Sequence, residues 1–223
     1  MSRKIFITAT DTGAGKTYLT SRLVGSLLKQ KQRALAIKPV ACGSSAEQPN
    51  EDVAELLRAQ NLSDPGLINL YDFSMPAAPS LAAAEEGREI DPATLTHWCH
   101  SRSSESDICL IEGVGGLMVP LNDHYLVSDW LAEMTDCEVM LVIGARLGCI
   151  NHALLTLKQL SDMNRSPNHI VINATDQSSA SDQALHALKP FLSKSTSLHI
   201  SPYQGDNQNI DRIAKAILAK NRN

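Results

Sequence analysis

The chain has 223 residues, of which 43% are apolar and 20% charged, and its formal net charge is −4 with a pI near 6. This composition excludes an intrinsically disordered chain, because enough apolar side chains are present to form a core. It also disfavours a nucleic-acid partner, because no basic cluster is present to contact a phosphate backbone. We expect residues 1–223 to form a single domain.

The sequence shows neither a membrane signal nor a disulfide pattern. Its first apolar run is too short for a signal-peptide core, and no stretch approaches the roughly 20 apolar residues of a membrane span. We therefore expect a soluble, cytoplasmic protein without a membrane partner. The five cysteines are scattered and lack C-x-x-C spacing, which disfavours a zinc site and a disulfide framework. Cys109 and Cys137, in or beside apolar runs, are expected to be buried thiols.

Short apolar runs alternate with helix-length segments along the chain. Six runs have the composition of strands, at residues 5–8, 34–37, 108–111, 139–143, 170–172 and 198–200. They are apolar at every position, which predicts strands that are covered on both faces. We therefore expect an α/β fold with an open, doubly wound, mainly parallel sheet flanked by helices. Loops are expected at residues 42–50, 74–79 and 201–209, the last of them before a final helix.

The first strand-like run leads directly into a phosphate-loop motif. Residues 12–17 read TGAGKT, and a helical pattern follows them. The small residues Gly13, Ala14 and Gly15 would let successive backbone N–H groups converge on a phosphate at the helix N-terminus. Lys16 would reach the β- and γ-phosphates, and the Thr17 hydroxyl would bind Mg²⁺. The motif predicts a P-loop NTPase fold that uses a nucleoside triphosphate.

Two positions at the start of this loop depart from related patterns. Thr10 stands where the common P-loop has its first glycine, so a glycine-rich helix entry that binds nothing is the alternative. Asp11 stands where a similar loop in partitioning ATPases carries an extra lysine. That difference argues against a switch ATPase that dimerises around its nucleotide. A P-loop ATPase of regulatory or partner-binding type stays the alternative to a metabolic enzyme.

Two acidic residues are candidate metal ligands. Glu112 follows the apolar run at 108–111 and precedes a glycine-rich segment, and open α/β sheets bind ligands at such strand ends. A carboxylate there can reach a Mg²⁺ ion held on Thr17, whereas a surface turn is the alternative. Asp52 also fits the first turn of an ordinary helix, so the pattern alone leaves its role open.

Lys38 follows the apolar run at 34–37. Its local sequence alone favours a solvated lysine at the end of a strand.

Four segments appear in an order and spacing that resemble dethiobiotin synthetases, at residues 9–17, 38–44, 111–116 and 148–156. The resemblance runs from about residue 3 to about residue 203, and its Lys-Pro-Val-Ala and Gly-Cys-Ile-Asn-His segments are together more specific than a P-loop. It implies a homodimeric enzyme that uses ATP, Mg²⁺, 7,8-diaminononanoate and CO₂ or bicarbonate. An amine would form a carbamate, ATP would convert it to a carbamic-phosphoric anhydride, and the second amine would close the ring. The products would be dethiobiotin, ADP and phosphate.

The resemblance also implies roles for single residues. Lys16, Lys38 and Thr12 match catalytic positions that contact the carbamate or the transferring phosphate. Thr17, Asp52 and Glu112 match the metal ligands. Thr12, Lys38 and Cys42 match positions that contact the substrate bound to the same subunit. Gly148, Cys149 and Asn151 match a segment that reaches the substrate of the neighbouring subunit.

Further residues match the ATP site of the family. Asn173 stands where an asparagine reads adenine, which suits an amide that both donates and accepts. Tyr203 is less specific, because a simple turn is the alternative there. The other matches, beyond the P-loop and the metal ligands, are Gly113, Val114, Gly115, Ser201 and Pro202.

Three residues differ from the family pattern. Gly13 replaces an acid, Ala9 replaces a common glycine, and Cys42 replaces a serine or threonine hydroxyl. A thiol is a weaker hydrogen-bonding group than a hydroxyl, so the substrate contact at Cys42 is expected to weaken. We expect activity to survive, because Lys38 and the metal carry the charge.

Overall fold

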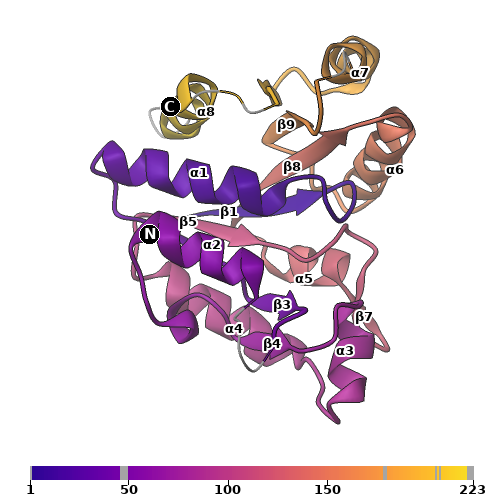
Figure 1. Ribbon diagram of the computed structural model, residues 1–223. Coiled ribbons are helices and arrows are strands. Elements are labelled where there is room, and N and C mark those ends of the chain that lie inside the picture. Colours follow the sequence, from indigo (N-terminus) through magenta and orange to yellow (C-terminus); the bar gives the residue numbers. More distant parts are fainter. Residues whose placement is uncertain (1, 46–49, 178–179, 204, 206, 220–223) are drawn as a thin grey trace.

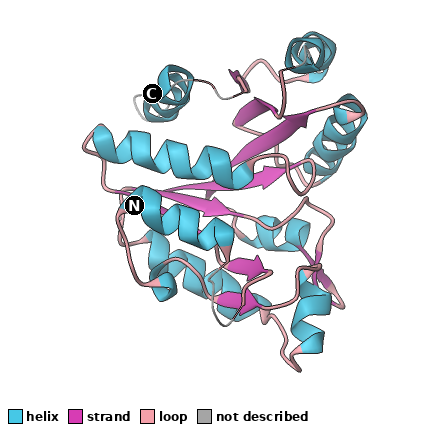
Figure 2. Cartoon of the chain, in the orientation of Figure 1, coloured by secondary structure: helices cyan, strands magenta, loops and turns pink. Residues whose placement is uncertain are grey.

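The computed structural model describes residues 2–45, 50–177, 180–203, 205 and 207–219. The strands that form its main sheet are β1 (Arg3–Ala9), β2 (Ala34–Ile37), β5 (Ile108–Glu112), β8 (Cys137–Ala145), β9 (His169–Ala174) and β10 (Ser197–Ser201). They form a six-stranded sheet in the order β10-β9-β8-β1-β5-β2, and every pairing is parallel (Figures 1 and 2). All six predicted strands and the predicted doubly wound sheet are confirmed.

The chain winds outward from β1 in both directions. After β1 it passes to β2 at one edge, returns to β5, and then crosses to β8, β9 and β10 on the other side. This reversal leaves a crevice at the carboxyl ends of the central strands, where open α/β sheets bind ligands. The register aligns Ile7 of β1 with Glu112 of β5, and Ala9 of β1 with Val142 of β8. The loops that follow these three strands therefore meet at one end of the sheet.

Helices cover both faces of the sheet (Figure 1). One face carries α1 (Lys16–Lys29), α2 (Glu51–Gln60) and α8 (Asn207–Ala219), and the other carries α4 (Pro92–Ser103), α5 (Val127–Glu133), α6 (Cys149–Asp162) and α7 (Ala180–Leu188). Leu19, Leu23 and Leu27 recur every fourth residue along α1 and are fully buried, which fixes the face that this helix turns inward. None of the helices in the described ranges has the length and apolar character needed to cross a membrane.

The core is centred on β1. Its residues Ile5, Phe6 and Ile7 are consecutive and all fully buried, although neighbouring side chains of a strand point to opposite faces. Phe6 packs edge-to-face against Trp130 of α5, with ring centroids 4.7 Å apart. Burial on both faces explains why the strands are apolar at every position, and it gives the loop after β1 a rigid base.

Several short elements surround the lower half of the sheet in Figure 1. β3 (Val40–Cys42) pairs in parallel with β4 (Tyr71–Phe73), and β6 (Pro120–Asn122) pairs with β7 (Tyr125–Leu126) in antiparallel fashion. α3 (Pro79–Glu85) lies beside β3, β4 and β6, and a 3₁₀ turn occupies Pro65–Leu67. A second 3₁₀ turn, Lys189–Phe191, follows α7 in another part of the molecule. The sequence did not predict these strands, because two or three residues carry no readable alternation.

The predicted loops prove shorter than expected. Cys42 ends β3, and Asn50 caps α2 by accepting hydrogen bonds from the backbone N–H groups of the helix's first turn. Pro79 begins α3, Ser201 ends β10, and α8 already begins at Asn207. Residues 46–49, 204 and 206 of the predicted loops lie outside the described residues. The boundaries at Asn50 and Pro79 were wrong because asparagine and proline are also favoured at helix starts.

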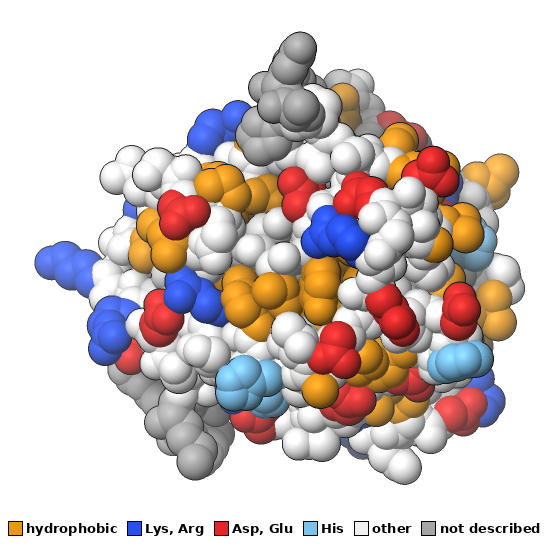
Figure 3. All heavy atoms as spheres, turned by 90° about the horizontal axis from the view of Figure 1, so that it is seen from below, with side chains coloured by type: hydrophobic (Ala, Val, Ile, Leu, Met, Phe, Trp, Pro, Cys, Tyr) orange, Lys and Arg blue, Asp and Glu red, His pale blue; other side chains and the backbone are white. Residues whose placement is uncertain are grey.

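Charged side chains of both signs share the face of the molecule shown in Figure 3. A nucleic-acid surface would be uniformly basic along a stripe or patch. This face does not have that character.

Candidate active site

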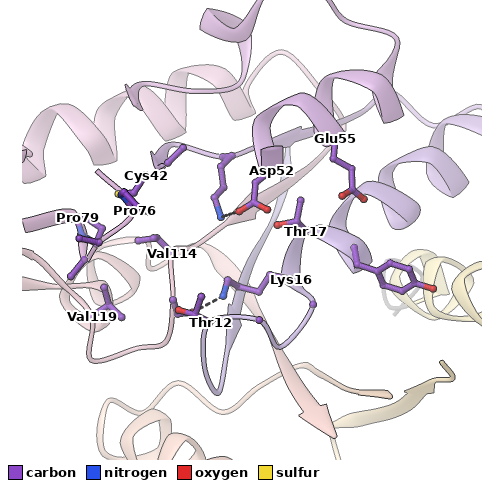
Figure 4. Close-up of a pocket in the computed structure, with 18 residues that line it drawn as sticks. Thr12, Lys16, Thr17, Cys42, Asp52, Glu55, Pro76, Pro79, Val114 and Val119 are labelled. Carbon is purple, nitrogen blue, oxygen red and sulfur yellow. Dashed lines mark hydrogen bonds and ion pairs between the residues drawn. The ribbon is translucent and has the colours of Figure 1, made fainter. Parts of the chain in front are cut away.

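A cavity of about 630 Å³ lies beside the P-loop, at the carboxyl ends of β1, β2 and β5. Figure 4 shows Lys16 and Thr17, at the start of α1, and Asp52, in α2, reaching toward it. The predicted site residues that line the cavity are Thr12, Gly13, Gly15, Lys16, Thr17, Lys38, Cys42, Asp52, Val114 and Gly115. The fold therefore brings residues from four distant parts of the sequence together, as the motif spacing predicted.

The P-loop is supported from behind by two neighbouring strands. Gly15 has a φ of +92°, and a Cβ added there would lie 2.1 Å from Nδ2 of Asn173 in β9. Nδ2 of Asn173 also donates to the carbonyl of Ala14 at 3.0 Å. A Cβ at Gly144 of β8 would lie 2.9 Å from Cα of Ala14. These close contacts hold the loop against the sheet, and no described side chain caps the N-terminus of α1, so that helix end can receive an anion.

Lys16 bridges the P-loop and the loop after β5. Its Nζ donates to the Gly115 carbonyl at 2.7 Å and lies 3.5 Å from the Asp11 carbonyl, and the residue is only 7% exposed. Burial and the nearby Lys38 ammonium lower the pKa of Lys16 from 10.5 to about 8. The group is therefore a cation at neutral pH, held by neutral acceptors that a phosphate can replace.

Lys38, the residue after β2, lies between two carboxylates. Its Nζ is 2.7 Å from Oε1 of Glu112 and 3.2 Å from Oδ2 of Asp52. The Thr17 hydroxyl donates to the same Glu112 oxygen at 2.7 Å. β2 and β5 are neighbours in the sheet, so the two strands deliver Lys38 and Glu112 to the same place. The arrangement joins the P-loop, α2 and two strand ends in one polar network.

Two members of the network are buried, whereas the Asp52 side chain is 45% exposed. Lys38 is 3% exposed and Glu112 is 0% exposed, so each charge depends on its partner. Burial alone would lower the pKa of the Lys38 ammonium, but Glu112 and Asp52 outweigh it and raise the pKa above its ordinary value. Burial would raise the pKa of the Asp52 carboxyl, but Lys38, Thr17 and Lys16 together outweigh burial and lower the pKa. The site thus favours a positive charge on Lys38 and a negative charge on Asp52.

Cys42 and Thr12 lie at opposite sides of the cavity. Cys42 is half-buried next to Pro76, and burial raises the pKa of its thiol to about 11 (Figure 4). It is therefore a neutral thiol at physiological pH, and a neutral thiol is a poor nucleophile. Thr12 is exposed at the P-loop, with its N–H donating to Oδ1 of Asp11 at 2.8 Å.

Comparison with known proteins identifies the family. A family profile described as an AAA domain matches residues 3–214. The ATP-dependent dethiobiotin synthetase BioD of Aromatoleum aromaticum is 41% identical over 193 residues, which is 84% of this chain and 85% of that protein. BioD 1 of Escherichia coli K12 is 36% identical over 160 residues, 70% of this chain and 71% of that protein. The chain belongs to the dethiobiotin synthetase family. The predicted resemblance is confirmed.

Solved structures place this dethiobiotin synthetase fold among P-loop proteins. The MinD cell division protein of Aquifex aeolicus aligns with a TM-score of 0.61 at 15% identity, covering 98% of both chains. A ParA family ATPase of Chlorobium tepidum aligns with a TM-score of 0.56 at 18% identity, covering 98% of this chain and 92% of the other. Identities this low show a shared fold only, and they confirm the predicted P-loop architecture.

Three oxygen-bearing side chains of the site are of the kind that can bind a magnesium ion. Oε2 of Glu112 is buried and has no hydrogen-bond partner among the described residues, while Thr17 and Asp52 lie on the same network. Carboxylate and hydroxyl oxygens are the ligands that Mg²⁺ prefers. Within the described parts of the chain, no three acidic, histidine or cysteine side chains form a complete metal cage.

Several predicted residues of the synthetase lie outside this cavity. Asn173 is buried behind the P-loop, and Ser201 of β10 pairs in register with it, with Pro202 and the exposed Tyr203 following. Ala14, Glu112 and Gly113 are buried and do not line the cavity. The segment with Gly148, Cys149 and Asn151 begins α6, and Gly148 and Cys149 line a separate hollow of about 350 Å³. The structure does not bring that segment into the cavity of its own chain.

Other residues line the synthetase cavity without having been predicted. Glu55 lies one helical turn after Asp52 on α2 and accepts a hydrogen bond from the Ser21 hydroxyl at 2.5 Å. Its spacing from Asp52 was a usable signal, because residues three apart share a helix face. The cavity is also lined by residues that carried no signal in the sequence, including Tyr18, Ala41, Pro76, Pro79 and Val119.

Proposed function

We propose that this dethiobiotin synthetase closes the cyclic urea of dethiobiotin from 7,8-diaminononanoate, CO₂ and ATP by way of a carbamate. Family membership supports the overall reaction. The observation that carries the mechanism is Lys38, a buried ammonium held by two carboxylates at the wall of a P-loop cavity. Phosphoryl transfer to a carbamate brings negative groups together, so a fixed cation at this place lowers the barrier.

The chemistry proceeds in three steps. One amine of the substrate attacks CO₂ and loses a proton, which leaves a carbamate. A carbamate oxygen attacks the γ-phosphorus of ATP, so that ADP leaves and a carbamic-phosphoric anhydride forms. The second amine then attacks the carbonyl carbon of the anhydride, the C–O bond to phosphate breaks, and the amine proton is lost. In this scheme Lys38 and Lys16 neutralise the carbamate and the moving phosphate, and Thr12 contacts both.

Nucleotide binding is assigned to the P-loop and its surroundings. The N–H groups of Gly13, Ala14 and Gly15 would hold the phosphates, helped by the backbone of residues 113–115. Thr17, Asp52 and Glu112 would hold Mg²⁺, which neutralises charge on the β- and γ-phosphate oxygens when it is bound. These assignments are supported by the free Glu112 oxygen and by the uncapped start of α1.

The base would lie near the ends of β9 and β10. Nδ2 of Asn173 already donates to Ala14, while its Oδ1 is buried and lacks a hydrogen-bond partner among the described residues. The oxygen of this amide can accept a hydrogen bond from the exocyclic amino group of adenine, and Nδ2 has a second N–H besides the one given to Ala14. Ser201, Pro202 and Tyr203 would flank the base on the same side.

A homodimer completes the proposed assignment. Gly148 and Asn151 are exposed at the start of α6 and do not line the cavity of their own chain. Their match to the family pattern supports a role, together with Cys149, at the substrate of the neighbouring subunit. A cytoplasmic location stays a prediction from the sequence.

ADP release by the purified enzyme tests the proposed function. We expect turnover of ATP with Mg²⁺ to require both the diamino acid and bicarbonate, with dethiobiotin formed in equal amount. Omitting either one should leave only background hydrolysis. ATP turnover that is independent of the diamino acid, with no dethiobiotin formed, would refute the synthetase and favour a regulatory ATPase.

A further inference from the structure

The P-loop of this protein contains a carboxylate that the mechanism above does not use. Asp11 lies between β1 and the glycine-rich part of the loop, and its side chain is 47% exposed. Its Oδ1 accepts the Thr12 N–H at 2.8 Å, and its Oδ2 accepts a hydrogen bond from Nη2 of Arg146. Its backbone carbonyl lies 3.5 Å from Nζ of Lys16. Asp11 therefore contacts Thr12 and Lys16 within the loop and Arg146 outside it.

A bare carboxylate is unfavourable at this position. A phosphate loop binds its ligand through converging N–H groups and positive potential, and a triphosphate carries several negative charges. The carboxylates of Asp52 and Glu112 are already offset by Lys38. Asp11 forms no ion pair with Lys38 among the described residues, and its side chain pairs with Arg146 instead.

Arg146 is well placed for this pairing. It directly follows β8, whose Gly144 packs against the P-loop backbone at Ala14. The strand thus fixes the start of the Arg146 side chain relative to the loop. The Arg146 side chain is 52% exposed and does not line the P-loop cavity. Its effect on the phosphates of a nucleotide would therefore pass through Asp11.

We propose that Arg146 is a positioning residue for the nucleotide, which neutralises Asp11 so that the P-loop accepts a triphosphate. The inference rests on the P-loop being the triphosphate site of the proposed function. Both side chains are half-exposed, and such ion pairs contribute up to about 1 kcal/mol, which corresponds to about a fivefold change in affinity. Salt should screen the effect.

Titration calorimetry with a non-hydrolysable ATP analogue and Mg²⁺, without the diamino acid, tests this proposal. At low ionic strength, Arg146→Gln should weaken binding about fivefold, since Asp11 is then uncompensated. Asp11→Asn keeps an acceptor for the Thr12 N–H and should bind as tightly as the wild type or more tightly. The double variant Asp11→Asn with Arg146→Gln should return to within about twofold of the wild type. Arg146→Lys keeps the charge and should change little.

Lys158→Gln is the matched control, because it also removes one positive charge from an exposed ion pair. Lys158 pairs with Asp162 within α6, and neither residue lines the nucleotide cavity. We expect its affinity to equal that of the wild type. Should Arg146→Gln fail to fold, Arg146→Met keeps the aliphatic stem and makes the same test.

Two results would overturn the proposal. Affinity that is unchanged in Arg146→Gln would mean that Asp11 needs no compensation. A double variant as weak as Arg146→Gln would mean that Arg146 contacts the nucleotide itself. Because the titration omits the diamino acid, a wild type that binds the analogue but makes no dethiobiotin refutes the proposed reaction and leaves this inference standing.

Discussion

At the residue scale, the central feature is the buried ammonium group of Lys38, which lies between two carboxylates. Lys38 and Glu112 are both buried, and each would be costly to bury alone. Asp52 completes the set at 3.2 Å from Nζ. Such a preorganised charge does not need to move when negative charge develops on a transferring phosphate, which is why it suits catalysis.

Replacing Lys38 with alanine should separate catalysis from nucleotide binding. We expect turnover to fall by roughly 10²–10³-fold, the size of effect seen when one preorganised donor is removed. ATP affinity should stay within a few-fold, because the P-loop and Lys16 are intact. Steady-state ADP release and calorimetric ATP affinity measure the two effects. Lys16→Gln is the comparison variant, and it should lose both turnover and affinity for ATP. Loss of nucleotide binding in Lys38→Ala would mean that the role of Lys38 is misassigned.

Cys42 should be slow to react with alkylating reagents despite its partial exposure. Burial raises its pKa to about 11, so the thiolate is about one part in a thousand at pH 8. A raised pKa means less thiolate at every lower pH, and the rate of labelling by iodoacetamide should rise about tenfold per pH unit up to that pKa. Mass spectrometry of the labelled peptide measures the rate. Cys42→Ser gives the blank, and rapid labelling at pH 7 would contradict the assigned environment.

At the scale of elements, sequence patterns predicted what depends on local composition. Apolar runs predicted all six strands of the sheet, and the run followed by TGAGKT predicted the P-loop and α1. The pattern gave no sign that β3 and β4 pair, because each has only three residues. It also placed several loop ends wrongly, since Asn50 caps a helix as readily as it forms a turn.

The candidate site is formed by contacts between distant elements, and local sequence patterns were not sufficient to predict those contacts. Read locally, Lys38 was a solvated lysine, and that reading is wrong because β2 pairs with β5 and aligns Lys38 beside Glu112. The role of Asp52 was open in the helix pattern, and its 3.2 Å contact with Lys38 now favours the site. The packing of Asn173 against Gly15 joins residues that are far apart in sequence, so no spacing rule reveals it.

At the scale of the whole molecule, a second ionic network lies at the amino ends of the strands, opposite the cavity. Nη2 of Arg3 in β1 donates to Oε2 of Glu138 in β8 at 2.8 Å, and Arg3 also donates to the carbonyl of Ile217 in α8. His169 of β9 lies 3.6 Å from the same Glu138 oxygen. The network joins the central strands to the last described helix. It supports our proposal that the chain folds as a single domain, which predicts coincident unfolding transitions by circular dichroism and tryptophan fluorescence.

Glu138 should make the stability of this domain depend on acid. Burial would raise the pKa of its carboxyl, but His169 and Arg3 outweigh burial and lower the pKa from 4.5 to about 2. A carboxyl with a depressed folded pKa stabilises the fold above its unfolded pKa, and that stabilisation is lost as pH falls through the folded pKa. The contribution is therefore complete above about pH 5 and declines between pH 4.5 and pH 2.

Glu138→Gln tests this linkage, because glutamine keeps the shape and removes the charge. At pH 7 the variant should have a free energy of unfolding about 1–3 kcal/mol lower than that of the wild type, since Arg3 is left without its carboxylate. Urea unfolding between pH 7 and pH 4 should show the difference holding near pH 6 and narrowing below pH 4.5. Asp162→Asn, in an exposed ion pair, should change stability by well under 1 kcal/mol at each pH. A difference between Glu138→Gln and wild type that stayed constant to pH 4, or grew, would mean that Glu138 keeps its ordinary pKa and that the network stabilises the sheet by packing instead of by charge.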